Sequence, residues 1–256
     1  MIHYVFDGSF TGLLCCVFEA FEMKEKNIRI FWDKTYQPTA FDQNRVIYSD
    51  QEKAQRVWNG FIKRTDSIAK KRFYFAYLSE NSQTFQHLFD MAVYVFQHKN
   101  NVAHNYGHPD VLAVAQMAKS VSREKHRMEA FIRFKKAADG LFYAIVNPDF
   151  NVLPLIQRHF KNRYADQPWL IYDKARKYGI YYDTETVEIV NLTFNPMTKN
   201  SDSNLPTLQI NDEKEALYDQ LWKDYFKSTN IVERKNTKLH LQHVPKRYWQ
   251  YLNEKQ

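Results

Sequence analysis

The stretch EAFIRFKKAADGLFYAIVN, residues 129–147, decides how the second half of the chain is interpreted. A helix through it would place the pair Asp139-Gly140 in its interior, where a glycine lowers helix stability. A two-residue type I′ turn favours the same pair, because both residues tolerate positive φ angles. The stretch therefore predicts two antiparallel strands, about residues 129–138 and 141–147, joined by a hairpin loop.

The register of this hairpin follows from its two-residue loop. The expected opposite pairs include Phe134 with Ile145, Lys135 with Ala144 and Ala137 with Phe142. One face is then mostly apolar and packs on the core. The other face combines rings and cations, as RNA-recognition sheets do when they stack bases and contact phosphates. The alternative is a solvated strand face, common in antiparallel sheets, with its rings covered by a helix. The residues of this second face are Phe131, Arg133, Lys135 and Phe142.

The segments that follow predict the rest of the same sheet. Three runs rich in Tyr, Ile and Val, residues 167–173, 177–183 and 186–192, are typical of strands. Residues 151–166 between them and the hairpin are typical of one helix, or of two short ones around Pro154. The predicted fold class is therefore α+β, with an antiparallel sheet over about residues 129–192, packed helices and an N-terminal strand–helix layer.

The N-terminal layer is predicted from apolar periodicity, which changes from strand-like to helical and back. After this layer the pattern becomes helical, and Pro109 marks the first turn of the last helix before the hairpin. The expected strands are residues 2–6, 27–32 and 45–49, and the expected helices are residues 10–26, 50–97 in three runs, and 110–128.

The domain organisation is predicted from composition. Residues 195–206 are polar and without periodicity, which is typical of a linker. They separate a main α+β domain, residues 1–194, from residues 207–256. We expect the latter to form a helix and a basic arm that pack on the main domain.

Composition limits the class of protein. Hydrophobic residues make up 44% and aromatic residues 16% of the 256 residues, which favours a folded core over a disordered chain. The formal net charge of +7 favours anionic partners such as nucleic acid. The longest apolar run, residues 13–18, is far shorter than a membrane span, and the N-terminus lacks a signal-peptide pattern. We therefore expect a cytoplasmic protein with no membrane partner.

The two cysteines, Cys15 and Cys16, are adjacent in a predicted helix and have the character of small buried apolar residues. They are too few for an iron–sulfur cluster, a cysteine zinc site or a disulfide framework, which agrees with the cytoplasm. His98, His104 and His108 lie close together, but their spacing matches no zinc pattern. The sequence thus predicts no metal site and no cofactor in this chain.

The segment DGSFTG, residues 7–12, joins the first predicted strand to the first predicted helix. In one interpretation Asp7, Gly8 and Ser9 form an anion-binding turn, whose backbone N–H groups hold a phosphate. In the other, Ser9 or Thr11 caps the helix and the turn has no ligand. The glycine spacing is not that of a Walker or dinucleotide-binding loop.

Basic side chains recur beside aromatic ones in the second half of the chain. Residues 230–256 alone carry six Lys or Arg and two Glu, a local charge of +4. Such a segment tracks a phosphate backbone through charge and stacking. Alternatively, the C-terminal arm packs back on the body through its rings. The expected nucleic-acid contacts are Arg123, Arg127, Phe131, Arg133, Lys135, Arg163, Arg234, Lys235, Lys238, Arg247, Tyr248 and Trp249.

Four segments together resemble a bacterial family of DNA metabolism and DNA repair proteins. They are DGSFTGLLCCVFEAF (7–21), SREKHRMEAFIRFKK (122–136), FYAIVNPDFNVLPLIQRHFKNRYADQPWLIYD (142–173) and NIVERKNTKLHLQHVPKRYWQYLNEK (230–255). Members are associated with a radical-SAM DNA modification or repair protein, and in other members a similar domain is joined to a uracil-DNA-glycosylase-like domain. The resemblance assigns no catalytic residue. It implies that an iron–sulfur cluster and S-adenosylmethionine would belong to a partner.

The first hypothesis for function is therefore a nucleic-acid-binding accessory subunit that presents DNA to a radical-SAM repair enzyme. A second is an enzyme of hydrolase or glycosylase type that acts on DNA or a nucleotide through Asp7 or His126. A third is a protein–protein adaptor that docks the radical-SAM partner without binding DNA.

Overall fold

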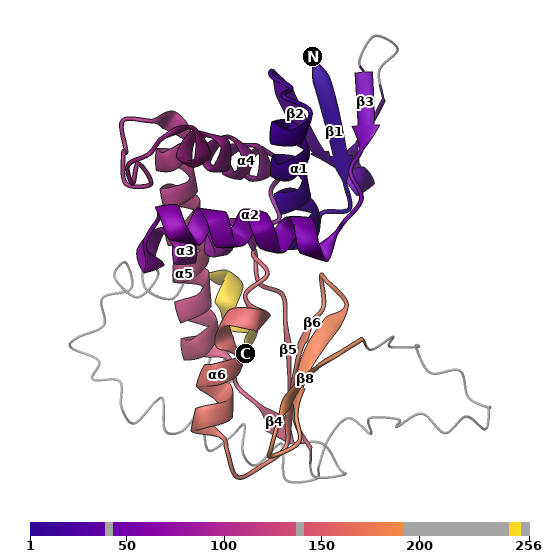
Figure 1. Ribbon diagram of the computed structural model, residues 1–256. Coiled ribbons are helices and arrows are strands. Elements are labelled where there is room, and N and C mark those ends of the chain that lie inside the picture. Colours follow the sequence, from indigo (N-terminus) through magenta and orange to yellow (C-terminus); the bar gives the residue numbers. More distant parts are fainter. Residues whose placement is uncertain (39–42, 137–140, 192–245, 252–256) are drawn as a thin grey trace. The chain divides into compact units, whose positions relative to one another are not determined.

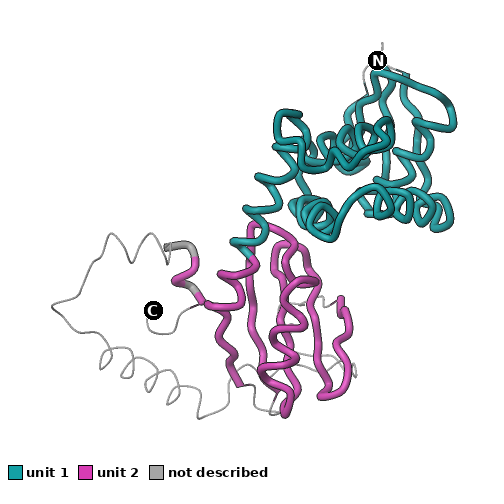
Figure 2. The backbone as a smooth tube through the Cα atoms, turned by 60° about the vertical axis from the view of Figure 1, so that its left-hand side comes forward, with its two compact units in different colours: residues 1–124 teal, residues 125–256 magenta. Residues whose placement is uncertain are grey.

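The computed structural model divides the chain into two compact units, Met1–Glu124 and Lys125–Gln256 (Figure 2). Each unit contains one sheet and its own buried residues. No helix in the described ranges combines the length and the apolar character needed to cross a membrane. The described ranges are residues 1–38, 43–136, 141–191 and 246–251.

Unit 1 is built on a three-stranded sheet with β1 (Ile2–Phe6) in the centre. β2 (Ile28–Trp32) and β3 (Gln43–Val46) pair with β1 on either side, both in parallel. Parallel neighbours need crossover connections, and α1 (Phe10–Glu22) provides the one between β1 and β2 (Figure 1). The residues of β1 after Ile2 are buried, as is typical of a central parallel strand. The three strands predicted for this layer are present, although β3 begins and ends earlier than expected.

Three helices follow, each begun by a side chain that accepts a hydrogen bond from the third backbone N–H of the helix. Asp50 caps α2 (Gln51–Arg64), Asp66 caps α3 (Ser67–Tyr77) and Asn81 caps α4 (Ser82–Gln97). Periodicity predicted three helical runs here, and the caps explain where each run begins. α5 (Pro109–Phe131) comes next and continues across the boundary between the units.

The core of unit 1 forms where α1 and α4 pack against the sheet and α2 packs on α1. Tyr4 of β1 and Leu88 of α4 have no exposed surface. Aromatic rings contribute much of the packing, and the centroids of Phe61 and Phe73 lie 4.8 Å apart. Both cysteines on α1 are free and buried, as the sequence predicted.

Unit 2 contains a five-stranded sheet in the order β4-β5-β6-β7-β8. β5 and β6 are parallel, because α6 carries the chain from one to the other, whereas the remaining neighbours are antiparallel. Two short 3₁₀ helices, η1 in unit 1 and η3 in unit 2, complete the described elements. The bounds are η1 (Asp33–Thr35), β4 (Lys135–Lys136), β5 (Phe142–Val146), α6 (Leu153–Arg163), β6 (Trp169–Asp173), β7 (Tyr178–Tyr182), β8 (Val187–Val190) and η3 (Lys246–Tyr251).

The fold class α+β is confirmed, but the sheet of unit 2 is mixed rather than antiparallel. The predicted strand at residues 129–138 is wrong in its first part, since α5 runs to Phe131 and β4 comprises only Lys135–Lys136. Met128 and Ile132 are both buried, and their spacing of four residues continues the apolar stripe of the helix. Burial of this stripe outweighs the strand preference of the aromatic run.

The register of β4 and β5 also differs from the prediction. Lys135 lies opposite Tyr143 rather than Ala144, a pairing that a two-residue loop cannot produce. Because side chains alternate between the two faces of a strand, a slip of one residue changes which side chains share a face, and Phe142 shares one with Lys136 instead of Lys135. Residues 137–140, which include the expected Asp139-Gly140 turn, lie outside the described residues.

The core of unit 2 forms around Trp169 on β6, which has no exposed surface. The centroid of its ring lies 6.1 Å from that of Phe160 on α6 and 6.0 Å from that of Phe134. Phe134 therefore packs on the core, as expected, although it lies in the segment between α5 and β4 rather than in a strand.

The core of unit 1 generates a stability prediction. Leu88→Ala should lower the free energy of unfolding by about 2–5 kcal/mol, because it removes a fully buried side chain and leaves a cavity. Urea unfolding followed by circular dichroism measures the change. The control is Leu112→Ala, since Leu112 is 40% exposed. Equal losses in the two variants would contradict the core described above.

Candidate functional site

The turn between β1 and α1 is the first candidate site, and Ser9 caps the helix as one interpretation of the sequence expected. The Ser9 hydroxyl accepts a hydrogen bond from the backbone N–H of Gly12 at 2.8 Å. The Asp7 carboxylate accepts the backbone N–H of Ser9 at 2.9 Å and the hydroxyl of Ser49 at 2.8 Å. An external anion would have to displace this carboxylate to reach the Ser9 N–H. The anion-binding role of Asp7, Gly8 and Ser9 stays a prediction.

Hydrogen bonding sets the ionisation of Asp7. Burial raises the pKa of its carboxyl group, but hydrogen bonds from Ser9 and Ser49 outweigh that effect and hold the pKa below its ordinary value. Asp7 is therefore a carboxylate at neutral pH. It is an exposed hydrogen-bond acceptor at the end of a buried strand.

Gly8 is held in a conformation that requires glycine. Its φ is +77°, and a Cβ atom there would lie 2.2 Å from Nε1 of Trp32. The same indole nitrogen donates to the Asp7 carbonyl at 3.1 Å, and the Tyr77 hydroxyl donates to the Gly8 carbonyl at 3.1 Å. Burial raises the pKa of Tyr77 to about 12, so its hydroxyl remains a donor at neutral pH. Two aromatic side chains thus fix the turn.

The position of this turn in the sheet also marks it as a candidate. The order β2-β1-β3 means that the chain leaves β1 toward β2 and later returns to the opposite side of β1. In open parallel sheets, ligands bind outside the carboxyl ends of the strands at such a reversal. Asp7 and Ser49 follow the carboxyl ends of β1 and β3, and their side chains are hydrogen-bonded there. The sequence indicated Asp7, but nothing local indicated Ser49, Trp32 or Tyr77.

Basic side chains on α5 form the second candidate site. Arg123 is exposed and Arg127 is partly exposed, as the first hypothesis requires. Lys119 and His126 are also exposed, and the spacing of three and four residues places all four on one face of this single helix. We call these four residues the α5 basic face. Lys119 was missed in the sequence, although its four-residue spacing from Arg123 would have indicated it.

The contacts of Arg123 and Arg127 leave their charges uncompensated. Arg123 donates to the Ser120 hydroxyl at 3.1 Å. Arg127 donates to the Tyr248 hydroxyl at 3.3 Å, and its guanidinium carbon lies 5.4 Å from the centre of that ring. Within the described part of the chain, neither arginine forms an ion pair with a carboxylate. Both guanidinium groups therefore retain a full positive charge for an outside partner.

The residues expected on the hairpin face do not share a strand face. Phe131 ends α5, and its ring lies 5.4 Å from that of Tyr248. Arg133 donates to the carbonyl oxygens of Ala130 and Ile132 at 2.8 and 3.2 Å, so it caps the carboxyl end of α5. The aromatic and basic strand surface predicted from residues 129–147 is thus not assembled as expected.

The other members of that set are placed separately. Lys135 is partly buried in β4, and Phe142 lies opposite Lys136 rather than Ala137. Lys135 lies on the short edge strand of the five-stranded sheet, and Phe142 lies on the strand next to it. Their expected contact with nucleic acid stays a prediction.

The remaining expected contacts lie farther along the chain. Arg163 is exposed at the end of α6, with its guanidinium 5.8 Å from the ring of Tyr164. Tyr248 is only 2% exposed, which makes it a packing residue, and Trp249 is partly exposed. Arg234, Lys235 and Lys238 lie outside the described residues, and only the backbone of Arg247 is described, within η3. No group of three or more His, Cys, Asp or Glu in the described ranges is arranged to hold a metal ion.

The ionisation of Asp7 generates a prediction. Because its folded-state pKa is lowered, the carboxylate stabilises the fold above its unfolded pKa, and this contribution is lost as pH falls through the folded pKa. Asp7→Asn should therefore be less stable than the native chain at pH 7, with a difference that shrinks below about pH 4. Urea unfolding at pH 7 and pH 3 measures both differences. Asp166→Asn at an exposed position is the control. A difference for Asp7→Asn that does not change with pH would contradict the hydrogen-bonding account.

Comparisons with known proteins identify the chain only at the level of a family. No curated protein and no solved structure matches it. A family described as a domain of unknown function, DUF4130, matches residues 82–254. The match begins at the first residue of α4 and includes α5 and all the described elements of unit 2. This chain belongs to the DUF4130 family.

Proposed function

We propose that this protein is a cytoplasmic nucleic-acid-binding accessory subunit that presents DNA to a radical-SAM repair or modification enzyme. The observation that carries the proposal is the α5 basic face, where Lys119, Arg123 and Arg127 lie along one helix without carboxylate partners among the described residues. A row of positive charges along one helix suits a phosphate backbone. Each of these charges that contacts a phosphate releases a condensed counterion, which favours binding.

The charge balance of the rest of the molecule supports the proposal. The chain has 36 Lys and Arg against 29 Asp and Glu. Several carboxylates are already used inside the fold, and Glu25 pairs with Arg45 at 2.8 Å and Glu19 with Lys53 at 2.7 Å. Each of these pairs uses one cation for one carboxylate, so the formal excess of +7 is unchanged and attracts a polyanion over distances of about 10 Å.

The partner is proposed from the sequence resemblance alone. The two cysteines of this chain are buried on α1, and a cubane iron–sulfur cluster needs more thiolates than two. The cluster and S-adenosylmethionine would therefore be held by the partner, and this chain would supply binding and positioning of DNA.

A second candidate function is a DNA- or nucleotide-processing enzyme. The observation that favours it is the ionised Asp7 carboxylate at the reversal point of the parallel sheet, where Ser49 and Ser9 orient it. A carboxylate in this position acts as a general base or holds a hydroxyl group of a substrate. The α5 basic face is not needed for this function.

Neutralising the α5 basic face tests the first candidate. Arg123→Gln/Arg127→Gln should weaken binding of a labelled duplex and lower the slope of log K against log salt by about 2, because two phosphate contacts are lost. Fluorescence anisotropy at several salt concentrations measures the slope. The control is Lys63→Gln/Lys70→Gln, which removes the same charge from exposed positions on α2 and α3.

Three outcomes separate the functions. A slope that falls equally in both double variants would mean that net charge alone acts, and would overturn the role of α5. Co-purification with the radical-SAM partner without measurable DNA binding would support the adaptor hypothesis instead. Strong binding to RNA but not to DNA would replace the proposed ligand.

The enzyme candidate predicts a product from the purified chain alone. Incubation with single-stranded, duplex and uracil-containing DNA, and with nucleotides, should yield a cleaved or modified product by mass spectrometry. Asp7→Asn should reduce the rate by about 100-fold or more, as expected when a general base is removed. Asp166→Asn should retain the rate. The absence of product across this panel would exclude the second candidate for these substrates.

A further inference from the structure

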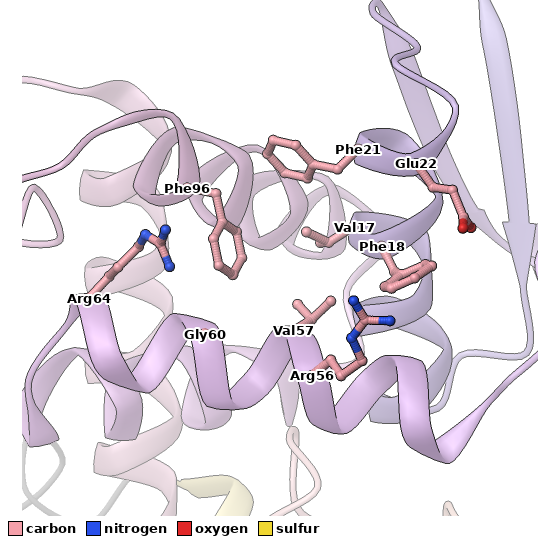
Figure 3. Close-up of a pocket in the computed structure, with 9 residues that line it drawn as sticks. All are labelled: Val17, Phe18, Phe21, Glu22, Arg56, Val57, Gly60, Arg64 and Phe96. Atoms are coloured by element: carbon pink, nitrogen blue, oxygen red, sulfur yellow. The ribbon is translucent and has the colours of Figure 1, made fainter.

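A pocket of about 590 Å³ lies within unit 1 among α1, α2 and α4 (Figure 3). Its volume is in the range of sites that hold small organic ligands. The buried side chains of Val17 and Val57 face each other from α1 and α2 and give it an apolar floor. Rings of Phe18 and Phe21 from α1 and Phe96 from α4 add aromatic walls.

Gly60 on α2 gives the pocket its shape. A Cβ atom at this position would lie 3.0 Å from Cε1 of Phe96, so only glycine lets the ring approach the helix without adjustment. The centroid of Phe96 lies 5.7 Å from that of Phe21 in an edge arrangement. Phe21 is 45% exposed, so a large aromatic surface remains open to solvent beside the pocket.

Two arginines flank the aromatic walls, both exposed and both on α2 (Figure 3). The guanidinium carbon of Arg56 lies 5.3 Å from the ring centre of Phe18, and that of Arg64 lies 5.2 Å from the ring centre of Phe96. Neither makes an ion pair or a hydrogen bond with another residue in the described ranges. The eight-residue spacing separates their Cα atoms by about 12 Å along the helix.

The acidic charge near the pocket is compensated in part, because one ammonium group serves two carboxylates. Glu22 lies 3.8 Å from the ammonium group of Lys53, which also pairs with Glu19 at 2.7 Å. Lys53, Glu19 and Glu22 together leave one negative charge, whereas Arg56 and Arg64 supply two positive charges, so these five groups sum to +1. The pocket combines an apolar floor, aromatic walls and two unpaired cations, which suits a ligand with a planar apolar part and a negative part.

We propose that this pocket binds a nucleoside phosphate, with the base against the phenylalanine rings and the phosphate on Arg56 or Arg64. Bases stack on aromatic side chains whatever their sequence, and guanidinium groups bind phosphate oxygens through paired hydrogen bonds. The ligand is either a free nucleotide or one nucleotide of a single strand. The pocket lies on other helices than the α5 basic face, so the two proposals stand on different residues.

Isothermal titration calorimetry of the full chain tests the proposal with deoxyadenosine monophosphate, deoxyadenosine and inorganic phosphate as probes. The monophosphate should bind at least about tenfold more tightly than either part alone, since both the stacking and the charged contact contribute. Arg56→Gln/Arg64→Gln should weaken it by about tenfold or more. Phe21→Ala should weaken it by about tenfold, with little effect on stability at this exposed position.

Lys63→Gln is the matched control, because Lys63 is an exposed cation next to Arg64 outside the pocket. A pentamer of deoxyadenylate distinguishes the two sources: tighter binding than the monophosphate assigns the pocket to a single strand, and weaker binding assigns it to a free nucleotide. Equal binding of inorganic phosphate and the monophosphate would overturn the proposal. So would no heat of binding, or equal losses in the arginine variant and the Lys63 control.

Discussion

The parallel pairing of β1 with both β2 and β3 constrains the arrangement of unit 1. Parallel strands cannot be joined by hairpins, so the chain must cross over the sheet, and α1 makes the first crossing. β2 and β3 lie on opposite sides of β1, and the carboxyl ends of β1 and β3 are neighbours. Asp7 and Ser49 follow these two ends and are hydrogen-bonded to each other there. Gly8 completes the geometry, because its positive φ and the Trp32 ring above it leave no room for a side chain. The first candidate site is thus a consequence of strand order.

The charged side chains of this molecule fall into two groups. Some cap helices or form ion pairs within the fold, and others can bind an outside ligand. Acidic side chains cap helices, as Asp50 and Asp66 do, or pair with cations, as Glu19 and Glu25 do. By contrast, the described contacts of Arg56, Arg64, Arg123 and Arg127 are with rings and neutral oxygens. An arginine on a ring keeps its charge and loses little hydration, so it remains ready to bind an anion. This pattern recurs on α2 and on α5 and is the common physical basis of both proposals.

Local signals predicted much of the fold. Periodicity located β1, α1 and the three helices from α2 to α4, and of the two caps that the sequence offered for α1, Ser9 or Thr11, the structure shows Ser9. The failures involve long-range contacts. The strand preference of residues 129–134 was overruled when Met128 and Ile132 became buried on one helical stripe. The parallel pairing of β5 with β6 depends on the path of α6, which no local pattern specifies. The same limit hid Trp32, Ser49 and Tyr77, which approach the Asp7 turn from distant segments.

The most direct test of nucleic-acid binding is the salt dependence of affinity for the native chain. Fluorescence anisotropy with labelled single-stranded and duplex DNA gives the dissociation constant at each salt concentration. If Lys119, Arg123 and Arg127 each contact one phosphate of a duplex, affinity should fall by about 40-fold between about 50 and 200 mM salt. No binding at the lower salt concentration, or an affinity that does not change with salt, would contradict the account.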